Sequence, residues 1–141
     1  MAVTGIHHFN LRASAKELDA LKEFYCDVLG FYVGERPAFR STGVWLYAGK
    51  TPLIHLTEMH SGEIVAPGSP ASLPEVAARS SAIDHIALAS DDLDGAERRL
   101  SRHGVAYTRT EVPATAEIQL LFRDPSGNGV ELIFPMGGAD H

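Results

Sequence analysis

Two stretches of the chain, residues 6–12 and 83–89, alternate between apolar and polar residues in matching ways. A period of two is typical of a β-strand with one face in a core and the other face open. In the first stretch, His8 and Arg12 fall on the same face, and in the second stretch His85 takes the place of His8. The pattern therefore predicts two related strands, each with a histidine near its start.

A helical pattern follows each of these strands. Ser14 with Glu17 three residues later is a capping-box signature, and the apolar residues beyond it recur at the spacing of a buried helical face: Leu18, Leu21, Tyr25 and Val28. In the second half, we expect Asp91 to cap a helix over roughly residues 92–103, with three residues on its inner side: Leu93, Ala96 and Leu100.

Three further strands are expected after each helix. In the first half they are predicted over residues 31–33, 44–47 and 53–56. In the second half they are predicted over residues 105–107, 117–123 and 130–134, with a turn at 124–129 before the last one. Each half of the chain is therefore predicted to form a βαβββ unit.

The two halves are predicted to be copies of one unit. Equivalent positions lie 77 residues apart for His8 and His85 (85 − 8), 74 for Gly30 and Gly104 (104 − 30), and 76 for His55 and Glu131 (131 − 55). These separations agree to within the changes that loops allow. We interpret residues 1–59 and 83–141 as two modules, and residues 60–82, rich in Pro, Gly and Ser, as a linker or lid.

A module of this size cannot bury its apolar face alone, so we expect an α+β fold in which two βαβββ modules pair their sheets around a shared, metal-containing cavity. If the first and last strands of each module are neighbours, His8 lies near His55 and His85 lies near Glu131. If both pairs point inward, the four side chains converge. We expect a homodimer, and the sequence permits the modules to pair within one chain or between two chains.

The four residues indicate a divalent metal ion. An inward Glu131 without a partner would lose its hydration at a large cost, which a cation removes. Three imidazoles and one carboxylate suit Zn, Ni, Co, Mn or Fe(II) and do not suit Ca. The ligand types alone leave the identity of the metal open.

Amino-acid composition indicates which classes of partner and which cellular compartment to expect. The chain has 141 residues and a net charge of −6, from 12 basic and 18 acidic residues, which argues against binding nucleic acid or an anionic membrane surface. Cys26 is the only cysteine, so an intrachain disulfide is excluded. With neither a signal-peptide pattern nor an apolar run long enough to span a bilayer, we expect a cytoplasmic protein.

The chain resembles the vicinal oxygen chelate superfamily, which includes glyoxalase I, bleomycin resistance proteins and extradiol dioxygenases. The resemblance is carried by four motifs in both halves: residues 8–11, 24–31, 83–88 and 122–132. It implies that His8, His85 and Glu131 are metal ligands. The fourth ligand position falls on His55, where glyoxalase I has a glutamate.

The resemblance implies a metal-dependent lyase, isomerase or epimerase that acts on a small substrate with adjacent oxygens and stabilises an enediolate. The base would be Glu131 or a metal-bound hydroxide. One alternative is a non-enzymatic binding protein that sequesters a small molecule. Another is an Fe(II) dioxygenase, although residues 110–123 contain neither the histidine nor the tyrosine that ring cleavage needs.

Three polar residues are predicted to contact the substrate. Arg12 lies four residues after His8, where glyoxalase I has an arginine that holds the glutathione carboxylate. Gln119 and Arg123 alternate on one face of their strand and are candidates for binding a substrate anion.

Overall fold

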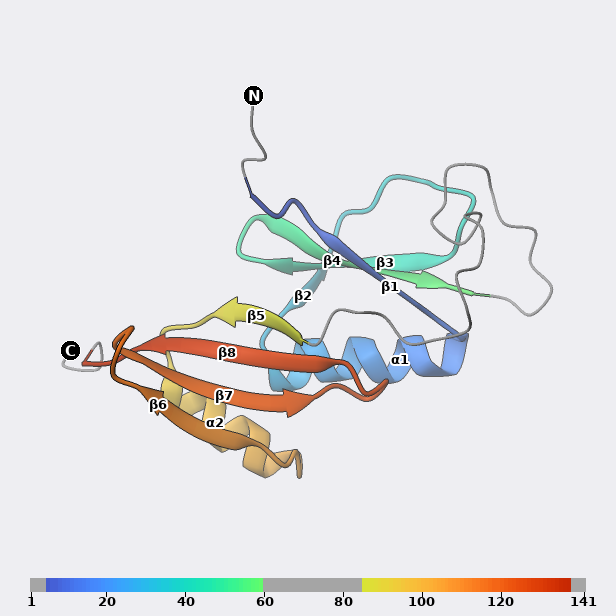
Figure 1. The fold of residues 1–141 in the computed structure, drawn as a ribbon. Coiled ribbons are helices and arrows are strands. Elements are labelled where there is room, and N and C mark those ends of the chain that lie inside the picture. Colours follow the sequence, from blue (N-terminus) through green and yellow to red (C-terminus); the bar gives the residue numbers. More distant parts are fainter. Residues whose placement is uncertain (1–4, 60–84, 138–141) are drawn as a thin grey trace, which may run out of the picture.

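The computed structural model describes residues 5–59 and 85–137, which form two four-stranded sheets, each with a helix against one face (Figure 1). The first module contains β1 (Phe9–Ala13), α1 (Ala15–Glu23), the π-helical turn η1 (Phe24–Val28), β2 (Tyr32–Gly34), β3 (Gly43–Ala48) and β4 (Thr51–Glu58). The second contains β5 (His85–Ala89), α2 (Leu93–Arg102), β6 (Thr108–Val112), β7 (Glu117–Arg123) and β8 (Gly129–Pro135). The strand orders are β1-β4-β3-β2 in sheet one and β5-β8-β7-β6 in sheet two, so the predicted βαβββ repeat is confirmed.

Neighbouring strands place the predicted ligands at matching points of the two sheets. β1 is the neighbour of β4, and β5 is the neighbour of β8, as expected, and both pairs are parallel. In sheet one, His55 lies between Asn10 of β1 and Trp45 of β3. In sheet two, Glu131 lies between Ala87 of β5 and Leu121 of β7. His55 and Glu131 therefore occupy the same position in each copy of the module.

The sequence locates α1 correctly. Ser14 caps the helix by accepting a hydrogen bond from the backbone N–H of Glu17, and the apolar stripe is buried as predicted: Leu18, Leu21, Tyr25 and Val28. Gly30 and Gly104 follow the two helices with φ angles of +80° and +68°, values that favour glycine over residues with a Cβ.

Two details of the second module differ from the prediction. The residue that caps α2 is Asp92 and not Asp91, because its carboxylate accepts a hydrogen bond from the backbone N–H of Gly95. The strand expected over 105–107 starts later, at Thr108, because the backbone N–H of Val105 is still bonded to Leu100 at the end of α2. The segment 60–82, predicted to be a linker or lid, lies outside the described residues.

One continuous core joins the two modules. The rings of Phe24 in η1 and Phe122 in β7 lie 6.1 Å apart, and Tyr25 donates a hydrogen bond of 2.8 Å to the buried carboxylate of Asp124. Arg99 of α2 also donates to the carbonyl oxygen of Val28. These contacts fix the second sheet against the end of the first helix. Within the described part of the chain, no helix is both long and apolar enough to cross a membrane.

The Tyr25–Asp124 bond is expected to contribute measurably to stability. Removing the hydroxyl in Tyr25→Phe takes one donor from a carboxylate that is only 4% exposed, which should lower the free energy of unfolding by about 1–3 kcal/mol. Urea denaturation measures this value. Tyr47→Phe is the control, since its hydroxyl bonds the Glu35 carbonyl at an exposed position and its loss should cost less than about 1 kcal/mol. An equal cost for both variants would contradict the assignment.

Candidate functional site

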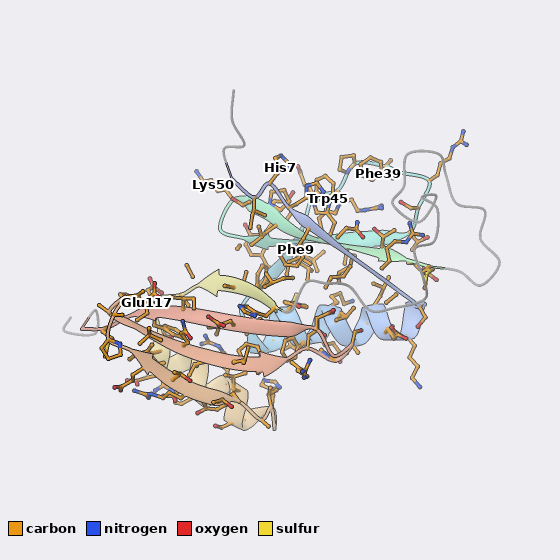
Figure 2. The ribbon with its side chains drawn as sticks, viewed as in Figure 1. His7, Phe9, Phe39, Trp45, Lys50 and Glu117 are labelled. Atoms are coloured by element: carbon orange, nitrogen blue, oxygen red, sulfur yellow. The ribbon has the colours of Figure 1, made fainter. Side chains whose placement is uncertain are left out.

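Each sheet has one face packed in the core and one open face. Ile54 and Leu56 of β4 are buried against α1, so His55 between them lies on the opposite face. In β8, Val130 and Leu132 are buried, and Glu131 takes the opposite face. In Figure 2, Phe9 points toward α1, whereas Trp45 and Phe39 lie on the other side of sheet one. The predicted ligands therefore lie on the faces that the helices leave open.

The first predicted pair, His8 and His55, is part of a stack of rings. The imidazoles of His8 and His55 are parallel, with centroids 3.9 Å apart, and the ring of Trp45 stacks on the other side of His55 at 4.1 Å. Because a carbonyl oxygen only accepts, the Nε2 of His55 must donate to the carbonyl oxygen of Pro52, at 3.1 Å. The lone pair of His55 is then on Nδ1.

The surroundings of His55 favour its neutral form. Burial is the main cause of its lowered pKa, and the charges of His8, His7 and Arg36 lower it further, while the bond to Pro52 acts in the opposite direction. A neutral imidazole with a fixed tautomer is the form that binds metal ions. The ring of His7 contacts His8, with their Nδ1 atoms 2.9 Å apart.

The second predicted pair, His85 and Glu131, forms an ion-pair contact. The Nε2 of His85 lies 3.3 Å from a carboxylate oxygen of Glu131. Glu131 is only 12% exposed, whereas His85 is 38% exposed. The carboxylate is therefore largely removed from water and directed toward an imidazole on the neighbouring strand.

The four predicted ligands come together as two pairs. Among residues 5–59 and 85–137, no group of three or more His, Cys, Asp or Glu side chains is arranged to hold a metal ion within one chain. His55 belongs to sheet one and His8 immediately precedes its strand β1, whereas His85 and Glu131 both belong to sheet two. Convergence of all four on one ion remains a prediction.

The predicted substrate-binding residues share these open faces. Arg12 is exposed and lies opposite Thr57 in the register of β1 and β4. Gln119 and Arg123 lie on the same face of β7 as Leu121, the neighbour of Glu131. Arg123 is exposed and donates a hydrogen bond to the carbonyl oxygen of Gly127.

A cavity of about 750 Å³ opens at the end of β7, lined by Arg123, Leu121, Phe122, Phe24 and Tyr107 among others. None of the four predicted ligands lines it. We therefore place the candidate site on the open faces that carry the histidines, and regard this cavity as a neighbouring hollow that Arg123 borders.

Three side chains outside the predicted site residues extend the open face of sheet one. The ring of Phe39 lies 6.0 Å from that of Trp45, and the guanidinium carbon of Arg36 lies 4.9 Å from the centre of the Phe39 ring. The alternation of residues 44–47 is the signal that could have found Trp45, because Leu46 beside it is buried in the core. Arg36 is a cation in a loop, and its charge is its only signal in the sequence, because nothing there indicates its contact with Phe39.

Comparison with known proteins gives a consistent result. The model of the Glyoxalase/Bleomycin resistance protein/Dioxygenase superfamily matches residues 5–132. A comparison with curated proteins found no match. Among solved structures, the fold is shared with a glyoxylase/bleomycin resistance protein/dioxygenase domain from Frankia sp. EAN1pec, at 22% identity and a TM-score of 0.67, covering 99% of this chain and 98% of that one.

Two further structural neighbours have names that describe different functions. One is a lactoylglutathione lyase from Agrobacterium tumefaciens, at 22% identity and a TM-score of 0.65, covering 98% of this chain and 97% of that one. The other is TnmS3, an antibiotic binding protein from Streptomyces sp. CB03234, at 23% identity and a TM-score of 0.62, covering 96% of this chain and 98% of that one. At these identities the likeness shows the fold alone.

Proposed function

Because the chain belongs to the Glyoxalase/Bleomycin resistance protein/Dioxygenase superfamily, we propose that it is a metal-dependent lyase, isomerase or epimerase acting on a small substrate with adjacent oxygens. The observation that carries this proposal is the matched register of His55 and Glu131 in the two sheets. Each has a histidine beside it, which is His8 just before β1 and His85 at the start of β5. If these were unrelated surface residues, matching positions in both sheets would not be expected.

The side chains present fit a divalent metal ion. The hydrogen bond from His55 to the Pro52 carbonyl leaves one ring nitrogen with a lone pair, and histidines that bind metals commonly donate their other ring N–H to a carbonyl or carboxylate. Glu131 supplies a largely buried negative charge that a cation would balance. Such a set of donors suits Zn, Ni, Co, Mn or Fe(II).

We propose that a second copy of the chain completes the centre. The two pairs lie at different sheets of one chain, each on the face opposite the buried side of its own sheet. In a homodimer with two-fold symmetry, the His8–His55 pair of one copy would meet the His85–Glu131 pair of the other, which gives two equivalent centres.

The chemistry would be divided between the metal and the protein. When bound, the metal ion would supply Lewis-acid stabilisation of the negative charge that develops on the substrate oxygens. Glu131, or a hydroxide on the metal, would remove a proton next to the substrate carbonyl. Gln119 and Arg123 extend from the same face of sheet two and would orient the polar end of the substrate. We propose that this reaction takes place in the cytoplasm.

Elemental analysis tests the proposal directly. Protein purified without a His-tag should contain about one divalent metal ion per chain, as expected for two equivalent centres in a homodimer. The bound metal then directs a screen of substrates with adjacent oxygens. Protein that holds no metal after purification, and takes up none of the five candidate ions, would exclude the metal-dependent reaction.

A non-enzymatic binding protein is the second candidate function. The observation in its favour is the half-exposed aromatic surface of Phe39 and Trp45 beside the histidine stack, a surface suited to a flat ligand. The discriminating measurement is again the metal content, because sequestration of a ligand on aromatic rings requires no metal. An Fe(II) dioxygenase is distinguished from both by uptake of oxygen.

Arg12 is expected to act on substrate binding more than on turnover. It lies on the open face of β1, two residues beyond Asn10 and beside Thr57. Arg12→Ala should raise KM for a carboxylate or thioester substrate about tenfold while kcat changes less, because the arginine would act on a remote part of the substrate. Steady-state kinetics measure both constants, with Lys16→Ala on the exposed side of α1 as the control. Unchanged constants in Arg12→Ala would remove Arg12 from the binding site.

A further inference from the structure

The open face of sheet one carries a row of aromatic rings that continues beyond the histidine pair. Trp45 stacks on His55 with an angle of 9° between the ring planes, and Phe39 lies beyond Trp45 at an angle of 43°. Phe39 is 53% exposed, so its ring is accessible to a ligand. Figure 2 shows both rings on the side of the sheet away from α1. The row therefore offers an aromatic surface of two tilted rings next to the candidate metal ligands.

Arg36 places a positive charge at the end of this row. Its guanidinium carbon lies 4.9 Å from the centre of the Phe39 ring, and one terminal nitrogen donates to the hydroxyl of Ser41 at 3.0 Å. Phe39 lies 6.0 Å from Trp45, whose ring stacks on His55 at 4.1 Å. The loop that contains Arg36 and Phe39 is therefore close enough to the histidine pair to contact the same small ligand.

One nitrogen of Arg36 has no acceptor. Its Nε is buried, and it is the only buried side-chain nitrogen or oxygen of the described residues without a hydrogen-bond partner. Buried donors in folded proteins are almost always paired, because leaving one unpaired is costly. A guanidinium is shaped to donate two parallel hydrogen bonds to a carboxylate or a similar anion. The guanidinium is therefore not fully paired within the described part of the protein, and an anion bound to it would balance its charge.

We propose that Arg36, Phe39 and Trp45 recognise a planar aromatic carboxylate, with its ring against Phe39 and Trp45 and its anionic group on the guanidinium of Arg36. This assignment names the substrate class of the site proposed above and rests on that proposed function for its catalytic meaning. The rings alone would favour any flat ligand, and the arginine alone would favour any anion. Their contact with each other selects molecules that combine both features.

Three small probes separate the two features in metal-free protein. Benzoate has the ring and the charge, benzamide has the ring without the charge, and cyclohexanecarboxylate has the charge without an aromatic ring. Trp45 is the only tryptophan in the chain, so its fluorescence reports binding at this surface directly, and titration calorimetry provides a second measurement. Benzoate should bind at least about tenfold more tightly than either analogue, as expected when a charge-assisted hydrogen bond and ring stacking act together.

Variants then assign each feature to a residue. Arg36→Gln should weaken benzoate about tenfold and leave benzamide within about twofold, because only benzoate uses the charge. Arg40→Gln, which removes the same charge from an exposed position in the same loop, should change neither value by more than about twofold. Phe39→Leu should weaken benzoate and benzamide together. Arg36→Lys keeps the charge without the planar fork, and should fall between wild type and Arg36→Gln.

The results that overturn the assignment are distinct from those that overturn the metal site. Equal affinity for the three probes, no binding of benzoate, or equal losses in Arg36→Gln and Arg40→Gln would each reject the recognition of an aromatic carboxylate. Circular dichroism confirms that the variants are folded before these results are compared. Because the titrations use metal-free protein, failure to find a metal ion would leave them unaffected. Conversely, if the protein binds metal normally but does not bind benzoate, only the proposed substrate class is rejected.

Discussion

Replacing Glu131 by glutamine is expected to remove most of the bound metal and at least about a hundredfold of the activity, while the fold is retained. Glutamine keeps the shape of the side chain but removes the negative charge that balances the cation. In the second pair it also removes the charge that faces the Nε2 of His85 at 3.3 Å. Metal content by elemental analysis and kcat by steady-state assay give the two values.

The control for this variant is Glu111→Gln, which removes a carboxylate from the exposed strand β6 of the same sheet. Glu111 lies 3.9 Å from Arg109 in an exposed ion pair, so its loss should change stability, metal content and activity little. The free energy of unfolding of each variant should lie within about 1 kcal/mol of the wild-type value when all three proteins are free of metal. Full metal content and full activity in Glu131→Gln would mean that the site is elsewhere in the protein.

The repeated pattern of the sequence predicts the two modules and the His8–His55 and His85–Glu131 pairs. Both follow from the alternation of residues along each strand. Alternation places His55 opposite the buried Ile54 and Leu56, and the same spacing places Glu131 opposite the buried Val130 and Leu132. Once the first and last strands of a module pair in parallel, each histidine near a strand start falls beside the ligand of the neighbouring strand. These steps need no knowledge of the other module.

The sequence pattern does not predict how one module packs against the other. It depends on contacts such as Tyr25 with Asp124, which are 99 residues apart in the sequence, and Phe24 with Phe122. A buried tyrosine in an apolar helical stripe predicts a core position, but not which partner its hydroxyl will find. Burial and the nearby carboxylate raise the pKa of Tyr25, and this follows only from the folded arrangement. The separation of the two pairs within one chain could not be predicted for the same reason.

Loops and helix ends account for the remaining differences. Asp91 and Asp92 are both suitable helix caps, and only the fit of the Asp92 carboxylate to the N–H of Gly95 decides between them. Arg36 belongs to an irregular loop, where periodicity carries no information on the direction of a side chain. Its contact with Phe39 and its unpaired Nε are therefore visible only in the structure.

Mixing two inactive variants is expected to restore metal binding and activity, because each centre would take one pair from each chain. The first variant combines His8→Ala with His55→Ala, and the second combines His85→Ala with Glu131→Gln. Homodimers of either variant lack one pair in both centres. A heterodimer has one centre with both pairs intact and one centre with neither. If chains associate at random, half of the dimers are heterodimers, so the mixture should recover about a quarter of the wild-type metal content and activity.

The experiment requires chains that exchange, so the two variants are co-expressed with different affinity tags, and the tags are removed before analysis. Light scattering after size exclusion should give the mass of two chains for the wild-type protein and for the mixture. Each variant expressed alone provides the baseline.

A heterodimer whose metal content and activity stay at this baseline would show that the pairs do not meet between chains. In that case the two sheets of one chain would have to close on each other, and the Phe24–Phe122 and Tyr25–Asp124 contacts that hold the modules in their present arrangement would have to separate. Recovery of activity therefore tests the metal centre and the arrangement of the modules in one measurement, because an intact centre in the heterodimer can form only from the His8–His55 pair of one chain and the His85–Glu131 pair of the other.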